Sequence, residues 1–253
     1  MSGRPSTSTR SEPRAVSTGA GAAVERALAR SRLYRLLALA FRYPDAARVG
    51  ALGQLAGAVP VEALGESGRA LRPALAELAS AAGATTPEAL QDQYVAAFGH
   101  VTLPDCPLYE SACGAGDPFQ QPQALANISG FYRAFGLEMA KDAAERADHL
   151  AVELEFMHYL AYREAYALEH HGREQARLIR GAQRRFLQDH LGRWGPVVAR
   201  AVAARADGAL AAAARLLERF LDAEARRSRI SPSPVAGAVH TGEVDGRSQE
   251  GEP

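Results

Sequence analysis

The sequence has few cysteines, no long hydrophobic run and no excess of charge of either sign. Its two cysteines, Cys106 and Cys113, are too few for a disulfide framework or a four-ligand zinc site. No run of about 18 apolar residues occurs, so no membrane-spanning helix is expected, and the first residues lack the apolar core of a secretory signal. The 29 basic and 29 acidic residues balance, which argues against a general nucleic-acid binder. A cytoplasmic protein is the simplest interpretation.

The two ends of the sequence differ in composition from the part between them. Residues 1–20 and 228–253 are rich in Ser, Gly and Pro, and both are predicted to be disordered tails. Between them, residues 21–227 carry apolar side chains at helical spacing, and no segment shows the alternation of a strand. The sequence therefore predicts an all-α fold, a single helical-bundle domain of about eight to ten helices.

Several helix ends can be predicted from local signals. Thr86 is expected to cap a helix that has Pro87 at its first position and ends at Gly99. Pro73 is expected to break the preceding helical stretch or to start a second helix. Residues 100–122 contain four prolines and two glycines, and a loop of this length in a compact domain is usually functional.

A long helix is predicted from about Glu145 to His171. A rotation of about 100° per residue places its side chains on two opposite stripes. The first stripe is apolar and predicted to face the core, and it consists of Leu150, Leu154, Met157, Ala161 and Leu168. The second stripe is acidic and aromatic, and it consists of Asp148, Glu155, Tyr159, Tyr162 and Tyr166. His149 and Glu153 are four residues apart, so they are expected to be neighbours on the flank of the helix.

This helix does not carry a complete catalytic or metal-binding set. Glu155 and His158 have the Glu-x-x-His spacing of di-iron bundles, but such sites need a second pair, and the chain has no other. There is no Gly-x-Ser-x-Gly nucleophile elbow and no phosphate-binding glycine loop. We therefore predict no catalytic residues, no metal site and no cofactor.

Two interpretations of the second stripe remain open. Asp148 can cap the helix and the tyrosines can pack against neighbouring helices. Alternatively, carboxylates beside tyrosines form a surface for a cationic, partly apolar peptide, because carboxylates pair with guanidinium groups and tyrosine offers rigid contact area.

Three segments resemble the TorD/DmsD/NarJ superfamily of redox-enzyme maturation chaperones, which assemble molybdoenzymes. They are LQDQYVAAFGHVTLPDCPLYES, ERADHLAVELEFMHYLAYRE and FLQDHLGRW, which together span about residues 90 to 195. The middle segment is similar to the family's Glu-x-Pro-Asp-His-Leu-x-x-Glu-Leu-x-Phe-Met pattern, except that Ala147 stands where the family usually has proline. The amino-acid sequence of this segment resembles that of chaperones for dimethylsulfide dehydrogenase, selenate reductase and their relatives.

The resemblance implies a non-enzymatic chaperone that binds the twin-arginine signal peptide and the apo-form of a molybdenum-cofactor oxidoreductase catalytic subunit before Tat export. The positions that match the family pattern are Tyr109, Ser111, Glu145, Asp148, His149, Leu150, Glu153, His190 and Trp194. Combined with the second stripe, the predicted signal-peptide-binding residues are Tyr109, Ser111, Asp148, His149, Glu153, Glu155 and Tyr159. No nucleic-acid partner and no membrane span are expected, and the chain is expected to be a monomer or homodimer.

Two other functions fit an all-helical chain. One is a metal- or nucleotide-dependent enzyme built in the bundle, and the other is a scaffold that only oligomerises. Metal analysis and a nucleotide-binding assay test the first, and a pull-down from cells tests the second, because a chaperone should retain one large apo-subunit.

Overall fold

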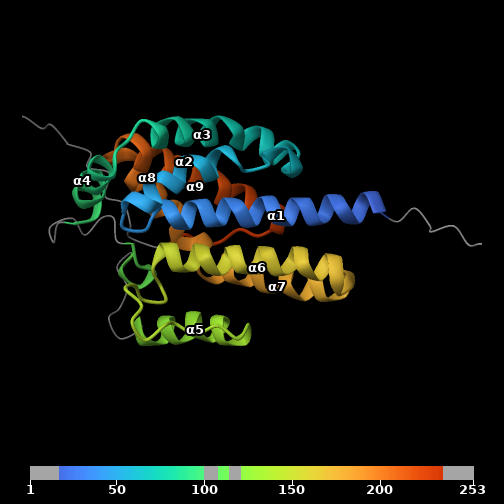
Figure 1. Ribbon diagram of the computed structural model, residues 1–253. Coiled ribbons are helices and arrows are strands. Elements are labelled where there is room, and N and C mark those ends of the chain that lie inside the picture. The colour runs from blue at the N-terminus through green and yellow to red at the C-terminus, as the bar shows by residue number, and fades with distance from the viewer. Residues whose placement is uncertain (1–16, 100–107, 114–120, 236–253) are drawn as a thin grey trace, which may run out of the picture.

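The computed structural model describes residues 17–99, 108–113 and 121–235, and the regular secondary structure in this part of the chain is helical apart from one isolated β-bridge (Figure 1). Within these ranges the α-helices are α1 (Ser17–Ala40), α2 (Ala46–Gly57), α3 (Glu66–Gly83), α4 (Pro87–Phe98), α5 (Gln121–Ala134), α6 (Leu150–His170), α7 (Gly172–Asp189), α8 (Leu191–Arg205) and α9 (Gly208–Ser228). Two short 3₁₀ helices, η1 (Val61–Leu64) and η2 (Glu110–Ala112), join them. The predicted all-α class is confirmed.

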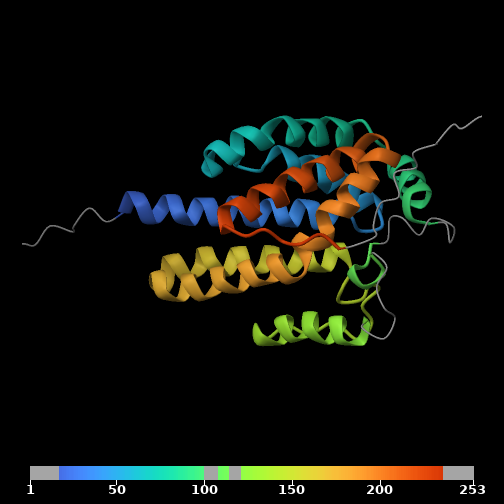
Figure 2. The same ribbon diagram turned by 180° about the vertical axis from the view of Figure 1, so that it is seen from behind.

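The helices form layers around α1. Figures 1 and 2 show α2 and α3 on one side of α1, α6 and α7 on the other, and α5 set apart beyond α6 and α7. α1 packs along α6, while α9 packs against both α3 and α8.

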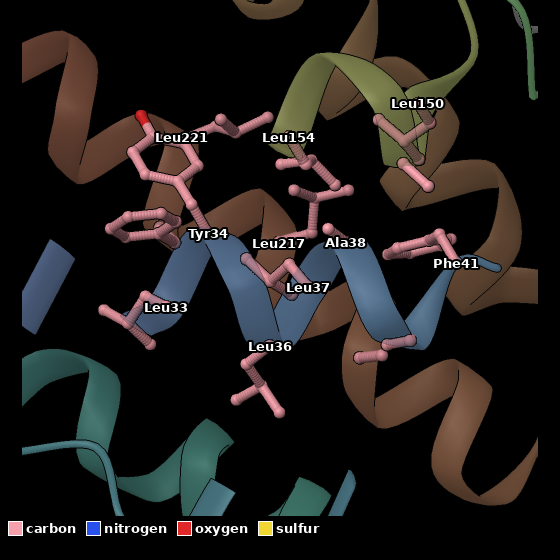
Figure 3. Close-up of a cluster of buried hydrophobic side chains, with 14 of the residues drawn as sticks. Leu33, Tyr34, Leu36, Leu37, Ala38, Phe41, Leu150, Leu154, Leu217 and Leu221 are labelled. Atoms are coloured by element: carbon pink, nitrogen blue, oxygen red, sulfur yellow. The ribbon is translucent and has the colours of Figure 1, made fainter. Parts of the chain in front are cut away.

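The core lies where α1, α6 and α9 meet. Figure 3 shows Leu37 of α1, and Phe41 just after that helix, near Leu150 and Leu154 of α6, with Leu217 of α9 beside them. All five side chains are fully buried. The predicted core stripe of α6 is confirmed for Leu150, Leu154, Met157 and Ala161, whereas Leu168 is only partly buried.

Local sequence signals explain several helix ends. The Thr86 hydroxyl accepts a hydrogen bond from the backbone N–H of Ala89 at 3.2 Å, Pro87 follows it, and Gly99 is the C-terminal cap, as predicted. Gly172 separates α6 from α7 with φ +84°, a backbone conformation that glycine adopts without steric cost.

The expected break at Pro73 is wrong, because α3 continues through it. Proline removes one backbone donor and crowds the carbonyl four residues earlier. Both Pro73 and Arg69 are exposed, so water can bond the carbonyl that proline leaves without a partner. Burial of Leu71, Leu75 and Leu78 on the opposite face stabilises the continuous helix.

Both predicted tails were a few residues too long. α1 begins at Ser17, and residues 229–235 contact the first turn of α8. The Arg193 Nε donates to the carbonyl of Ser233 at 3.2 Å, and the backbone N–H of Val235 donates to the carbonyl of Arg193 at 3.3 Å. The rest of both predicted tails, and most of the predicted loop 100–122, lie outside the described residues.

A buried ionic network joins α1, α6, α7 and α9, and nothing in the sequence pattern predicted it. Arg30 is 3% exposed; its guanidinium donates to Glu224 at 2.6 to 3.0 Å, to Glu164 at 2.9 Å, and to Gln183. Burial alone would raise the pKa of Glu224, but the charges of Arg30 and Arg227 lower it to about 2. Glu224 therefore stays ionised inside the bundle, which is possible only because its charge is paired.

Candidate functional site

The start of α6 is fixed by a segment that lies about forty residues earlier in the chain. Residues 108–110 run antiparallel to residues 148–150, with one bridge between Tyr109 and His149. The backbone N–H of Glu110 donates to the carbonyl of Asp148 at 2.9 Å, and that of Leu150 donates to the carbonyl of Leu108 at 2.8 Å. This pairing connects the described part of the predicted functional loop to the central helix.

His149, and not Asp148, caps α6. Its Nδ1 accepts a hydrogen bond from the backbone N–H of Ala151 at 3.1 Å. Burial lowers the pKa of His149, which favours the neutral ring that can accept this bond. The helix therefore begins at Leu150, five residues later than predicted at Glu145, because His149 has extended backbone angles and pairs with Tyr109.

Asp148 is fully buried and binds the loop instead. Its carboxylate accepts from the Ser111 hydroxyl at 2.6 Å and from the Ser111 backbone N–H at 3.2 Å. Arg146 donates to the same carboxylate at 3.0 and 2.9 Å and also contacts the Ser111 hydroxyl at 2.7 Å. Burial opposes ionisation, but the hydrogen bonds from Arg146 and Ser111 lower the pKa of Asp148. The placement of Asp148 on the second stripe is therefore wrong, because Asp148 precedes α6 and is buried.

Tyr109 and Glu145 complete this cluster, which we call the loop anchor (Tyr109, Ser111, Glu145, Arg146 and Asp148). The Tyr109 hydroxyl donates to Glu145 at 2.5 Å, and the Arg146 guanidinium carbon lies 4.6 Å from the centroid of the Tyr109 ring. Burial, followed by the hydrogen bond to Glu145, raises the pKa of Tyr109 to about 12. The sequence interpretation missed Arg146, although it lies within the matched motif.

Glu153 is also buried and does not form the expected surface pair with His149. The Trp194 indole donates to Glu153 at 3.1 Å, and burial, then the neighbouring charge of Glu110, raises the pKa of Glu153 well above its ordinary value. His190 lies 3.0 Å from the Glu110 carboxylate and, through its other ring nitrogen, 3.0 Å from Asn127. Glu153 and Trp194 thus connect α6 to α8, while His190, between α7 and α8, connects to η2 and α5; all three side chains are buried and do not form an open surface.

The remaining two predicted residues, Glu155 and Tyr159, lie at a surface groove. A cavity of about 200 Å³ is lined by Tyr132, Leu137, Glu138, Met139, Val152, Glu155, Phe156 and Tyr159. A neighbouring cavity of about 220 Å³ shares Tyr132, Leu137, Glu138 and Met139 with it. We call this combined surface the α5–α6 groove.

The groove has an apolar floor and acidic groups at its edge. Glu155 pairs with Arg42 at 2.7 Å, and both side chains are partly exposed, at 46% and 30%. The Tyr159 hydroxyl donates to the carbonyl of Phe135 at 3.4 Å, which orients the ring toward the groove wall. Glu138 supplies a second carboxylate. An apolar floor flanked by carboxylates suits a chain segment that combines arginine with apolar side chains.

The structure therefore divides the predicted site into two parts. Tyr109, Ser111, Asp148, His149 and Glu153 belong to the loop anchor and its buried surroundings, whereas Glu155 and Tyr159 line the α5–α6 groove. The groove residues Leu137, Glu138 and Met139 were missed, because they lie between helices and follow no periodic pattern.

Glu155 and His158, which have the spacing of a metal-binding pair, contact different residues. Glu155 reaches Arg42, while the His158 Nδ1 lies 2.7 Å from the Ser31 hydroxyl and 2.9 Å from the Ser31 carbonyl. Among the described residues, no three His, Cys, Asp or Glu side chains are grouped to hold a metal ion. In the same part of the chain, no helix is long and apolar enough to cross a membrane.

The chain belongs to one class of protein, the redox-enzyme maturation chaperones of the TorD/NarJ type. Residues 65–200 match the family of the nitrate reductase delta subunit, and the chain is a member of that family.

Its relatives include named assembly chaperones. The chain is 34% identical over 211 residues to the perchlorate reductase assembly chaperone protein of Dechloromonas aromatica (strain RCB), which covers 79% of this chain and 90% of that protein. It is 36% identical over 152 residues to the selenate reductase assembly chaperone protein of Thauera selenatis, covering 58% and 73%.

A solved structure is also similar. A putative redox enzyme maturation protein from Archaeoglobus fulgidus matches with a TM-score of 0.50 and 25% identity, over 76% of this chain and 93% of that one. These relatives are named as chaperones or maturation proteins, not as enzymes, in agreement with the incomplete catalytic set in the sequence.

Proposed function

We propose that this protein is a cytoplasmic chaperone for the catalytic subunit of a molybdenum-cofactor oxidoreductase. It binds the twin-arginine signal peptide and the apo-form of that subunit. It holds the subunit until the cofactor has been inserted, and Tat export follows. The observation that supports this proposal is the α5–α6 groove, which combines an apolar floor with the carboxylates of Glu138 and Glu155.

The groove offers the contacts that such a leader needs. A guanidinium group of the leader can replace Arg42 on Glu155, and the exchange costs little because exposed ion pairs contribute at most about 1 kcal/mol. The apolar part of the leader can then contact Leu137, Met139 and Phe156. The loop anchor lies outside this contact and supports it, because it fixes the start of the helix that forms one wall.

The experiment is titration calorimetry at two salt concentrations with a peptide that has the sequence of the client subunit's twin-arginine leader. Glu155→Gln and Tyr159→Ala are expected to weaken binding several-fold each, the first more strongly at low salt, where charges are screened least. A leader with both arginines replaced by glutamine should bind weakly to the wild-type protein. It should bind Glu155→Gln with the same affinity as the wild-type protein.

Glu218→Gln is the matched control. Glu218 on α9 is 38% exposed and pairs with Arg200 at 3.2 Å, so it resembles Glu155 in exposure and partner but does not line the groove. Equal weakening by Glu155→Gln and Glu218→Gln would mean that net charge, and not the groove, determines binding. A pull-down from cells should in addition retain one large apo-subunit.

A further inference from the structure

Another cavity opens where α1, η1, α3, α6, α7 and α9 meet. It shares no lining residue with the α5–α6 groove. Its volume is about 280 Å³. The residues that line it are Ala23, Arg26, Ala27, Arg30, Leu64, Ser67, Leu71, Glu164, Arg180, Phe220, Ala223, Glu224 and Arg227. The lining thus combines apolar side chains with four arginines and two glutamates.

The charges around this cavity do not cancel. Four arginines face two glutamates, which leaves an excess of two positive charges. The two carboxylates are already occupied, since Arg30 binds both Glu164 and Glu224 in the buried network. Arg227 adds a contact of 3.0 Å to Glu224 at the edge of the cavity, and Arg180 reaches Glu164 only at 3.5 Å.

The mouth of the cavity therefore holds donors that the protein does not saturate. A guanidinium group has five N–H donors in a planar fork. Arg180 uses one of them in its long contact with Glu164, and within the described ranges no ion pair or hydrogen bond engages the exposed side chain of Arg26. These groups surround an opening whose floor includes Leu71 and Phe220, both fully buried.

We propose that this cavity binds a small organic oxyanion, a phosphate or carboxylate group carried on a compact apolar body. The planar fork of arginine matches both kinds of oxyanion. A cavity of about 150 Å³ lined by apolar side chains holds a benzene ring, so the 280 Å³ here accommodates one ring with its charged group. Arg30 pairs with both carboxylates, which offsets part of their repulsion of an anion. This proposal is independent of the proposed chaperone function.

The test is titration calorimetry of the full-length protein in chloride buffer of low ionic strength, with phenyl phosphate, benzoate and the neutral benzyl alcohol. At least one of the two anions is expected to bind at a single site. Benzyl alcohol is expected not to bind, because it carries no charge. Tighter binding of phenyl phosphate assigns a phosphate ligand, and tighter binding of benzoate assigns a carboxylate. Arg26→Gln and Arg180→Gln should each weaken that binding about two- to fivefold, the loss expected for one partly exposed charged contact.

Arg173→Gln is the matched control, because Arg173 is an exposed arginine of the same helix as Arg180 but does not line the cavity. None of the three substituted arginines is itself buried, and all three variants should bind the leader peptide like the wild type. The proposal is overturned if neither anion binds saturably up to about 1 mM, or if Arg173→Gln weakens binding as much as the other two.

Discussion

Asp148→Asn separates a structural role of the loop anchor from direct recognition of a peptide. The carboxylate accepts two hydrogen bonds from Ser111 and two from Arg146. The single oxygen of asparagine can retain Ser111, but its NH₂ group then faces the guanidinium donors. A charge-assisted hydrogen bond contributes about 1.5–3 kcal/mol, and because the Arg146 side chain is 51% exposed the ionic part is reduced. We expect a loss of about 2–3 kcal/mol in the free energy of unfolding.

The pH dependence gives this prediction its sign. The pKa of Asp148 is lowered in the folded protein, so the stabilisation is fully present above its unfolded value of about 3.9 and is lost as pH falls through the folded value. Urea unfolding at pH 7 should therefore show the full difference between wild type and Asp148→Asn, and the difference should shrink below about pH 4.

Peptide titration on the same samples completes the experiment. Glu155→Gln should have the unfolding free energy of the wild type but bind the leader more weakly. Asp148→Asn should have a lower unfolding free energy, and its affinity for the leader should fall only to the extent that residues 108–111 detach from the start of α6. The reasoning fails if Asp148→Asn unfolds within about 0.5 kcal/mol of the wild type, the usual range for a surface substitution, and still loses peptide binding. Asp148 would then contact the peptide directly.

Two buried carboxylates give further predictions. The pKa of Glu153 is raised in the folded state, so its favourable contribution is complete below the unfolded value of about 4.3 and is lost as pH rises toward the folded value. Glu153→Gln should therefore gain stability relative to the wild type as pH rises above about 4.3, by up to about 1.4 kcal/mol per pH unit, in denaturant titrations; a difference that does not change as pH rises from that value would contradict a raised pKa of Glu153. Glu224 has a pKa lowered to about 2, so wild type should lose stability as pH falls from about 4.3 through that value. Glu224→Gln leaves Arg30 without its main partner and should cost about 3–5 kcal/mol at pH 7, and thermal melts at pH 7 and pH 3 would refute this if the variant matched the wild type at both.

The sequence predicted the fold class well because helical periodicity and capping are local. Thr86, Pro87 and Gly99 each act within a few residues, and the structure confirms them. The start of α6 was wrong because its cap depends on pairing between residues 108–110 and 148–150, which no local pattern encodes.

The buried charges could not be predicted for a similar reason. Arg30 lies in a stretch that also contains Arg26 and Arg32, and only the assembled bundle places Glu164 and Glu224 beside it. Glu153 has helical spacing to His149, which favours a surface pair, but Trp194 of α8 covers it. Of the predicted binding residues, Glu155 and Tyr159 are the two that line the groove. Glu155 is exposed and Tyr159 is partly exposed, and the helical spacing of α6 was enough to place both on the second stripe.

α5 is attached to the rest of the molecule mainly by aromatic side chains. Phe131 meets Phe186, Tyr132 meets Phe156 and donates to the carbonyl of Ala147 at 2.7 Å, and Phe135 meets Phe156. The contacts that join α5 to α6 and α7 are mainly of this aromatic kind, whereas α6 packs extensively against α1. The two walls of the α5–α6 groove are therefore held unequally. If the groove binds a leader as proposed, a shift of α5 alone would change the width of the groove and leave the core of α1, α6 and α9 in place.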